Sequence, residues 1–305
     1  MEFGVIAVSF VLVSALAVTL QVFFYSPLSP DILELPHDHS SHLFAPNNDL
    51  QKVIKIGEGI LNKPEGLCLD QKGMLYTATR DGWIKRLHTN GTCENWKKIH
   101  DRDTLLGLIV TKAGDLVVCD TEEGLIKVSE DGAVTAIATH MNGENIKFAD
   151  DVAEAGDGSL YFSIASTKFG LHDWPLDVLE AKPHGQLLKY DPATMETSLV
   201  LDRLGFANGV TVSSDQEFLV VCESWKCLKY WLKEEMKGKV EVFIDNLPGA
   251  PDNINVAPDG AVERSAMALN VGSDGKIIKR LDDPTGEVMA FVTSVLEFNG
   301  KLYFG

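Results

Sequence analysis

A short motif recurs along most of the chain and restricts the folds that are open to it. Each copy starts with a turn and an apolar run of the β type, and most copies later place two apolar or near-apolar residues before a lysine. The turn and run recur at Gly73–Thr77, Gly114–Val118, Gly158–Phe162, Gln216–Val220 and Gly300–Phe304. With the turn and β-type stretch that follow, each unit has four short strands, at a spacing of roughly 40–45 residues. This pattern predicts β-propeller blades, in which neighbouring blades bury each other's faces.

Six such units begin near residues 65, 106, 150, 208, 252 and 292, so we expect an all-β, six-bladed propeller. The third unit is longer, and its extra residues include Leu171–Glu180. Within this insertion, Trp174, Leu176, Val178 and Leu179 with flanking acids predict a short amphipathic helix that packs on the propeller. Long insertions in compact folds tend to be functional, which favours a lid over the channel rather than an edge decoration.

The last two units depart from the pattern. The fifth begins normally at Pro251–Gly260, but its next strand reads Ala261–Ser265 and is not apolar. The sixth stops within its second strand, and Gln51–Ile56 is expected to supply an outer strand to it. We therefore expect an incomplete last blade, in a shortened version of a longer chain.

The first 25 residues hold a long apolar run, Phe3–Tyr25. Its length is enough to span a bilayer of about 30 Å, whereas a secretory signal usually has a shorter apolar region and a basic start. The start carries Glu2 and no lysine or arginine, so a membrane anchor is favoured slightly over a cleaved signal. Either one predicts entry into the secretory pathway, to the endoplasmic reticulum, vacuole or another lumen. Residues 26–50 are predicted to be a linker and residues 51–305 the propeller.

The net charge, the cysteines and one sequon indicate which partners, disulfides and modifications to expect. The formal net charge of −17 argues against nucleic acid as a partner, because phosphates require a basic surface. The five cysteines do not have the spacing of a zinc finger. Cys222 and Cys227 are the nearest pair that could form a disulfide. Because the number of cysteines is odd, at least one thiol is free or paired outside the chain. Asn90-Gly91-Thr92 is a sequon in a turn, which predicts glycosylation of Asn90 if that turn is lumenal.

Most of the candidate metal-binding residues occupy the same position in successive repeats. The residue eight positions before each turn anchor lies where a strand starts nearest the propeller axis: Glu65, Leu106, Asp150, Asn208, Asp252 and Val292. Four of these six residues offer oxygen ligands, and three are carboxylates that repel one another if they converge without a cation. Calcium accepts carboxylate and amide oxygens, so the pattern predicts an axial calcium ion. The alternatives are that these residues cap turns, or that they line a polar channel without metal.

No nucleophile motif of a known hydrolase type is present, so no catalytic residue can be assigned with a mechanism. Among the histidines, His172 is placed best, on the predicted lid. Trp174 on the same lid is the candidate contact for a small hydrophobic substrate.

Several segments together resemble the strictosidine synthase-like family of plants. They run in the family's order through nearly all of residues 50–305: Lys63–Asp70, Phe148–Val152, Gly185–Pro192, Phe206–Val210, Asp245–Ile254 and Met289–Glu297. The resemblance implies a six-bladed propeller in an endomembrane or vacuolar setting. The family is related to the animal adipocyte plasma membrane-associated protein, which is anchored by its N-terminus, and lies within the paraoxonase and gluconolactonase-like superfamily.

The resemblance also bears on activity. True strictosidine synthases condense tryptamine with secologanin by means of a glutamate at the start of the last blade, and Thr293 stands at that place here. The metal ligands of the calcium-dependent paraoxonases and gluconolactonases correspond to Glu65, Asn208 and Asp252, with Asp150 where those enzymes usually carry Asn, and Asn253 follows as in the paraoxonases. The leading hypothesis is thus a calcium-assisted hydrolase of small esters or lactones. An alkaloid-type condensing enzyme and a non-enzymatic lumenal or membrane propeller remain the alternatives.

Overall fold

The structure is a computed structural model. It describes residues 2–32, 47–88, 90–233, 235–245, 247, 249–256, 262–264, 268–283, 285, 288–289 and 292–305. Residues 257–261 and 265–267, which include the first and last residues of the unusual fifth-unit segment, lie outside this set.

Five antiparallel sheets of four strands follow one another along the chain, each with its strands in sequence order. Their strands are β1 (Pro64–Leu69), β2 (Leu75–Thr79), β3 (Trp83–Leu87) and β4 (Cys93–Lys98); β5 (Leu105–Val110), β6 (Leu116–Asp120), β7 (Gly124–Val128) and β8 (Val134–Ala138); β11 (Ala149–Glu154), β12 (Leu160–Ile164), β13 (Gly185–Asp191) and β14 (Glu196–Leu204); β15 (Val210–Val212), β16 (Phe218–Glu223), β17 (Lys226–Trp231) and β18 (Val240–Ile244); β19 (Ile254–Val256), β20 (Val262–Arg264), β21 (Ala268–Val271) and β22 (Ile277–Leu281). A two-stranded sheet, β23 (Val295–Phe298) and β24 (Lys301–Phe304), comes last, and a small ribbon pairs β9 (His140–Met141) with β10 (Glu144–Asn145).

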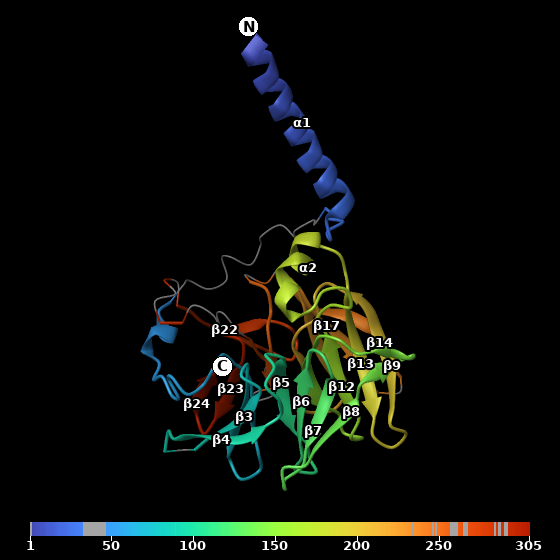
Figure 1. The fold of residues 1–305 in the computed structure, drawn as a ribbon. Coiled ribbons are helices and arrows are strands. Elements are labelled where there is room, and N and C mark those ends of the chain that lie inside the picture. The colour runs from blue at the N-terminus through green and yellow to red at the C-terminus, as the bar shows by residue number, and fades with distance from the viewer. Residues whose placement is uncertain are drawn as a thin grey trace.

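The first strands of successive sheets form a closed ring. Along this ring, β1 contacts β5, then β11, β15, β19 and β23 follow, and β23 contacts β1 again. Each sheet therefore acts as one blade around a common axis, and Figure 1 shows the sheets arranged in this way. The all-β propeller is confirmed, and the ring of six sheets is consistent with six blades, the last with two strands among the described residues. The fifth sheet has four strands despite its polar β20.

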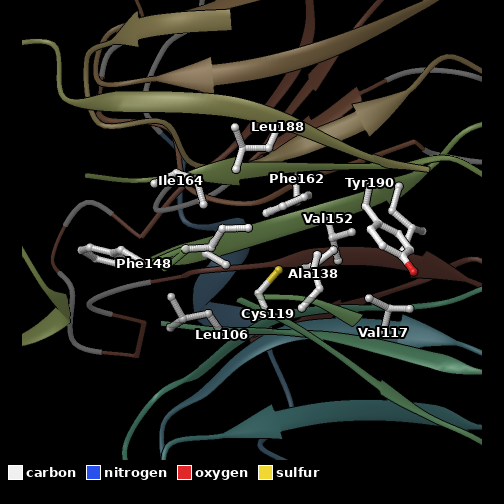
Figure 2. Close-up of a cluster of buried hydrophobic side chains, with 14 of the residues drawn as sticks. Leu106, Val117, Cys119, Ala138, Phe148, Val152, Phe162, Ile164, Leu188 and Tyr190 are labelled. Atoms are coloured by element: carbon white, nitrogen blue, oxygen red, sulfur yellow. The ribbon is translucent and has the colours of Figure 1, made fainter. Parts of the chain in front are cut away.

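The hydrophobic core lies between adjacent blades, because neither face of a blade can be buried within the blade itself. Figure 2 shows the largest contact of this kind, between the second and third sheets, where Leu106, Cys119, Phe148 and Phe162 meet. All four side chains are at most 2 % exposed. Leu106, one of the two axial positions without an oxygen ligand, thus belongs to the core.

The N-terminal segment forms α1 (Glu2–Tyr25), a single helix that projects away from the propeller (Figure 1). Within the described residues, Ile6–Tyr25 has the length and apolar composition to cross a membrane, with a mean hydropathy of 2.3, and none of this segment is buried. The chain after α1 returns directly to the propeller: the Ser29 and Asp31 N–H groups donate to the Glu180 side chain and main chain at 2.8 and 2.9 Å.

The predicted insertion helix exists as α2 (Trp174–Glu180), preceded by the 3-10 helix η2 (Leu171–Asp173). The predicted packing of its apolar residues was wrong. Asp177 and Glu180 face the propeller and are 2 % and 1 % exposed, while Val178 and Leu179 point outward. The acids are buried because they find partners there, Ser166 for Asp177 and Lys168 for Glu180.

The prediction that Gln51–Ile56 adds a strand to the last blade was also wrong. Asp49–Lys52 form the 3-10 helix η1, and the residues after it form no strand. The segment is fixed instead by hydrogen bonds to the end of the fifth sheet, from Leu50 N to Asp282 O at 3.1 Å and from Gln51 Nε2 to Asp283 Oδ1 at 2.9 Å. Because the segment bonds to the fifth sheet and pairs with no strand that the structure describes, the Ile54 side chain remains 88 % exposed.

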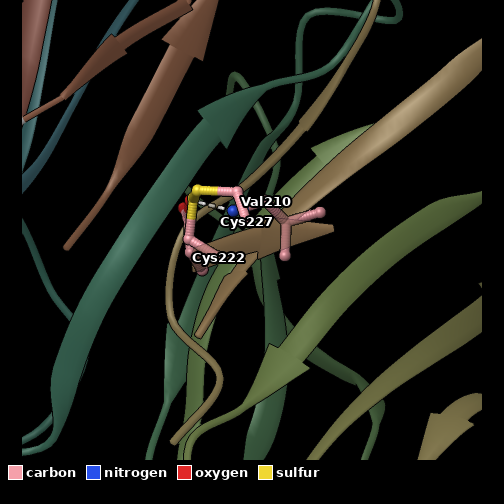
Figure 3. The surroundings of a disulfide bond; sticks show 4 residues. Val210, Cys222 and Cys227 are labelled. Carbon is pink, nitrogen blue, oxygen red and sulfur yellow. Dashed lines mark hydrogen bonds between the residues drawn. A yellow bond between two sulfur atoms is a disulfide. The ribbon is translucent and has the colours of Figure 1, made fainter. Parts of the chain in front are cut away.

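Cys222 and Cys227 form a disulfide that joins β16 to β17 next to Val210 of β15 (Figure 3). The two residues are directly paired across the strands. Cys68, Cys93 and Cys119 are free thiols.

Candidate functional site

The predicted axial residues Glu65 and Asp150 lie where the regular pairing of an inner strand is interrupted. The register shifts between Pro64 and Leu67 in β1 and between Ala149 and Val152 in β11, as a β-bulge would produce, and β5 shifts at the equivalent place. A bulge turns a side chain out of the alternation of the strand and is frequent next to functional sites. Asn208 and Asp252 reach the corresponding position differently, since each lies just before its strand β15 or β19.

The three axial carboxyl groups are close enough to affect one another's ionisation. Burial first, and then the charges of Asp252 and Glu65, raise the pKa of Asp150 well above its usual range. Burial and the charge of Glu65 likewise raise the pKa of Asp252 well above its usual range, although a hydrogen bond from Asn208 works in the opposite direction. The structure therefore brings Glu65, Asp150, Asn208 and Asp252 into one electrostatic cluster, which we call the axial cluster.

Arg80, which sequence reasoning missed, is a cation beside this cluster. It follows β2, and its Nη2 lies 3.6 Å from Glu65 Oε2 while its Nη1 lies 3.3 Å from Asp103 Oδ1. The guanidinium lowers the pKa of Glu65, but burial outweighs it, so the net direction is upward. One arginine thus leaves the axial cluster short of positive charge. Repeat counting could not find Arg80, because the other blades carry no equivalent residue.

Two asparagines at the axis have polar atoms without a partner. Asn208 Oδ1 and both amide atoms of Asn253 are buried and make no hydrogen bond. A buried polar atom without a partner costs about 1–3 kcal/mol, so such atoms usually indicate a missing ligand or water. Amide and carboxylate oxygens are calcium donors, and the donor set therefore fits that ion. In the part of the chain that the structure describes, however, no three His, Cys, Asp or Glu side chains are already grouped as metal ligands, so the donors would have to move closer together to bind the ion.

Left-handed backbone precedes three of the four residues of the axial cluster. Lys63, Phe148 and Phe206 have φ angles of 46°, 51° and 56°, and each lies two residues before Glu65, Asp150 or Asn208. Large side chains rarely adopt this conformation, which costs of order 1–3 kcal/mol and clusters at functional sites. The repeated strain is independent support for a functional role of this end of the axis.

A cavity of about 310 Å³ lies on the axis beside the inner strands. It is lined by residues of five inner strands and of the last unit, among them Gly66, Asp151, Asn253 and Ser294. Asp151 Oδ2 accepts the Val210 N–H at 2.9 Å and so joins the third blade to the fourth. Burial raises the pKa of Asp151 to about 7, despite this hydrogen bond.

Three of the histidines that the structure describes are either exposed or held by partners. The weak catalytic candidate His172 lies exposed on η2. His100 is held on both ring nitrogens, by Asp120 Oδ2 at 2.5 Å and by the Arg102 N–H at 3.2 Å. His184 Nε2 lies 3.0 Å from Glu180 Oε2, in the base of α2.

The remaining predicted residues are placed as follows. Trp174 packs near Phe206 with the two rings tilted by 55° and their centres 6.4 Å apart, so it lies near the Asn208 side of the axial cluster. Thr293 donates from Oγ1 to the Glu65 carbonyl at 3.0 Å, and its position is therefore next to the cluster. Asn90 is exposed in the turn between β3 and β4, where its Oδ1 accepts from Thr92.

Comparison with known proteins identifies the relatives of this chain. Residues 43–87 match the N-terminal model of the strictosidine synthase-like family, and residues 150–235 match the strictosidine synthase model. Protein STRICTOSIDINE SYNTHASE-LIKE 7 of Arabidopsis thaliana is 40 % identical over 67 % of this chain. The chain belongs with the strictosidine synthase-like proteins. It spans 56 % of the length of that plant relative. The adipocyte plasma membrane-associated protein of Rattus norvegicus is 28 % identical over 90 % of this chain and 91 % of its own length.

Solved structures confirm the fold of this strictosidine synthase-like chain. A gluconolactonase from Xanthomonas campestris has a TM-score of 0.66 at 17 % identity, covering 80 % of this chain and 83 % of its own. Regucalcin from Agrobacterium tumefaciens, described as a calcium-binding protein, has a TM-score of 0.54 at 14 % identity, covering 73 % and 75 %. At these identities the likeness establishes the propeller alone.

Proposed function

We propose that this strictosidine synthase-like propeller is a calcium-assisted hydrolase of small, hydrophobic esters or lactones. The observation that carries the proposal is the axial cluster, in which burial and the charges of Asp252 and Glu65 raise the pKa of Asp150, and burial and the charge of Glu65 raise the pKa of Asp252, beside the unpaired Asn208 Oδ1. A cation would relieve this repulsion, and no residue of a covalent nucleophile motif competes for the role. The gluconolactonase and regucalcin neighbours, by the activities in their names, support lactone chemistry and calcium as the first choices to test.

Different residues of the chain would bind the ion and orient the substrate. Glu65, Asp150, Asn208 and Asp252 would hold the ion, with Asn253 beside them. Bound calcium would supply a Lewis acid that polarises the substrate carbonyl. Trp174 and Phe206 present apolar rings next to the cluster and would orient the hydrophobic part of the substrate.

Strictosidine formation is disfavoured by the residue at the start of the last unit. That condensation requires a base to deprotonate the amine and the indole intermediate. Thr293 has no such basicity, and its hydroxyl is already directed to the Glu65 carbonyl. We therefore place a condensing activity second.

The hydrolase proposal predicts calcium-dependent turnover by the purified full chain on a panel of aryl esters and aliphatic lactones. Chelation should abolish this turnover, and Asp252→Ala should lower kcat/KM by about 10²-fold or more, because an electrostatic contribution to the transition state is lost. Asp274→Ala removes an exposed acid that pairs with Lys276, so it should leave turnover unchanged. Hydrolysis that is indifferent to both chelator and Asp252→Ala would contradict the assignment, as would strong condensation of tryptamine with secologanin.

We further propose that the propeller is lumenal and stays attached to a membrane through α1. Asn90 is exposed in a turn and free to accept a glycan there. Expression in plant or insect cells should give a chain whose mobility shifts on endoglycosidase treatment, and Asn90→Gln should lose the shift. A chain without glycan that fractionates with cytosol would disprove the location.

A further inference from the structure

The outward face of α2 is apolar, which reverses the usual orientation of a surface helix. Trp174, Val178 and Leu179 are 48 %, 41 % and 64 % exposed, whereas Asp177 and Glu180 of the same helix are buried. A helix of a soluble protein normally places its apolar residues toward the core and its charged residues in water. Here the three apolar side chains form an exposed patch, which we call the α2 patch, although the Trp174 ring also contacts Phe206.

The buried acids explain why the helix keeps this orientation. Glu180 accepts from Lys168 Nζ at 2.7 Å, from the Ser29 N–H at 2.8 Å and lies 3.0 Å from His184 Nε2. Burial opposes ionisation of Glu180, but these hydrogen bonds outweigh it and lower its pKa to about 2. Rolling the helix to bury Leu179 would break this set of charged hydrogen bonds, so the α2 patch is held outward.

The same contacts hold the α2 patch close to the end of the membrane-spanning helix. Lys168 Nζ also donates to the Pro27 carbonyl at 3.0 Å, and Lys182 Nζ donates to Ser29 Oγ at 3.0 Å. Ser29 is four residues beyond Tyr25, the last residue of α1, and four residues span at most about 14 Å. Figure 1 shows the end of α1 directly beside α2. A bilayer that holds α1 therefore has its surface within reach of α2.

We propose that the α2 patch lies in the interface of the bilayer that holds α1, with Trp174 at the level of the lipid headgroups. Tryptophan and tyrosine favour this zone, and apolar side chains of interfacial helices enter the adjoining acyl region. The inference rests on the proposed membrane attachment through α1. It adds that the propeller has a fixed orientation, in which the face bearing Trp174 and the axial cluster is turned toward lipid.

Tryptophan fluorescence can test this orientation in the intact chain. The five tryptophans all lie outside α1, so their emission reports on the propeller alone. The full chain is reconstituted into phosphatidylcholine vesicles with and without bromine on the upper part of the acyl chains. Brominated lipid should quench part of the emission, and Trp174→Phe should remove most of that quenching. Trp231→Phe is the matched control, because Trp231 lies on β17 and bonds to Glu241, and it should leave the quenching unchanged.

A second variant separates insertion from mere proximity. Leu179→Glu places a charge on the most exposed residue of the α2 patch and touches no core contact, so the melting temperature should stay the same while quenching of Trp174 falls. Leu199→Glu, on the exposed edge strand β14, should have no effect on quenching. A chain that does not float with the vesicles overturns the membrane attachment and this inference together. A chain that floats with Trp174 unquenched, or with quenching insensitive to Leu179→Glu, overturns the orientation alone.

Discussion

Calcium at one hundred times its dissociation constant should raise the melting temperature of the purified chain by about 5–10 °C. A ligand that binds only the folded state adds about 2.7 kcal/mol at that concentration, and about 1 kcal/mol corresponds to about 2–4 °C for a domain of this size. The effect is expected because, without a cation, the buried Asp150 carboxyl group is repelled by Asp252 and Glu65, and Asp252 is repelled by Glu65. Differential scanning calorimetry with added calcium and with chelator measures it directly.

Two variants and the pH dependence test whether the calcium response comes from the axial cluster. Asp252→Ala should remove most of the calcium response, while Asp274→Ala should keep it, since Asp274 is exposed beside Lys276. The response should also grow with pH, because the raised pKa values mean that calcium must displace protons from the cluster in acid. A melting temperature that changes with neither calcium nor chelator would show that the four residues of the axial cluster only cap turns.

Gly209→Ala should destabilise the fold by about 3 kcal/mol or more, because an added methyl group has no room. Gly209 directly follows Asn208, and a Cβ at this position would lie 2.6 Å from the Asp252 carbonyl oxygen and 2.7 Å from the Ile254 nitrogen. These two atoms are backbone, and the Ile254 Cγ2 atom lies 2.6 Å away as well, so the fourth and fifth blades would have to separate at the axis. Chemical denaturation should show the lower midpoint.

The same substitution should weaken the calcium response, because Asn208 and Asp252 lie on the two blades that separate. Gly170→Ala is the control: its φ is −88° and no atom lies within 4 Å of the added Cβ, so stability should not change. Equal stability of Gly209→Ala and the unmodified chain would show that the inner strands do not pack as closely as described.

The sequence predicted the blades and the axial positions because both repeat. A turn, an apolar run and a lysine at regular spacing define each sheet, and counting back from each turn selected Glu65, Asp150, Asn208 and Asp252, which the structure brings together electrostatically. Features that occur only once could not be predicted from the sequence in this way. Arg80 occurs once, and the register shifts at Glu65 and Asp150 leave no signature in residue type.

The errors share one cause, which is that polarity patterns do not reveal long-range partners. In α2 the hydrophobic period was real, but the helix orientation follows Lys168 and Ser29, which bind Glu180 from outside the insertion. Likewise, Gln51–Ile56 has β-type residues, yet Asp282 and Asp283 at the end of the fifth sheet fix it in another form.

The Cys222–Cys227 bridge links the compartment in which the chain matures to the quality of its ligand site. Asn208 N donates to the Cys222 carbonyl at 2.9 Å, and Cys222 N donates to the Gly209 carbonyl at 2.9 Å, so the bridged hairpin carries the main chain of Asn208. The disulfide therefore also constrains the main chain that carries Asn208, one of the proposed calcium donors. With the proposed calcium site, material made in a reducing cytosol would have the same residues on a less constrained hairpin, and we expect it to bind calcium more weakly than material with the disulfide formed.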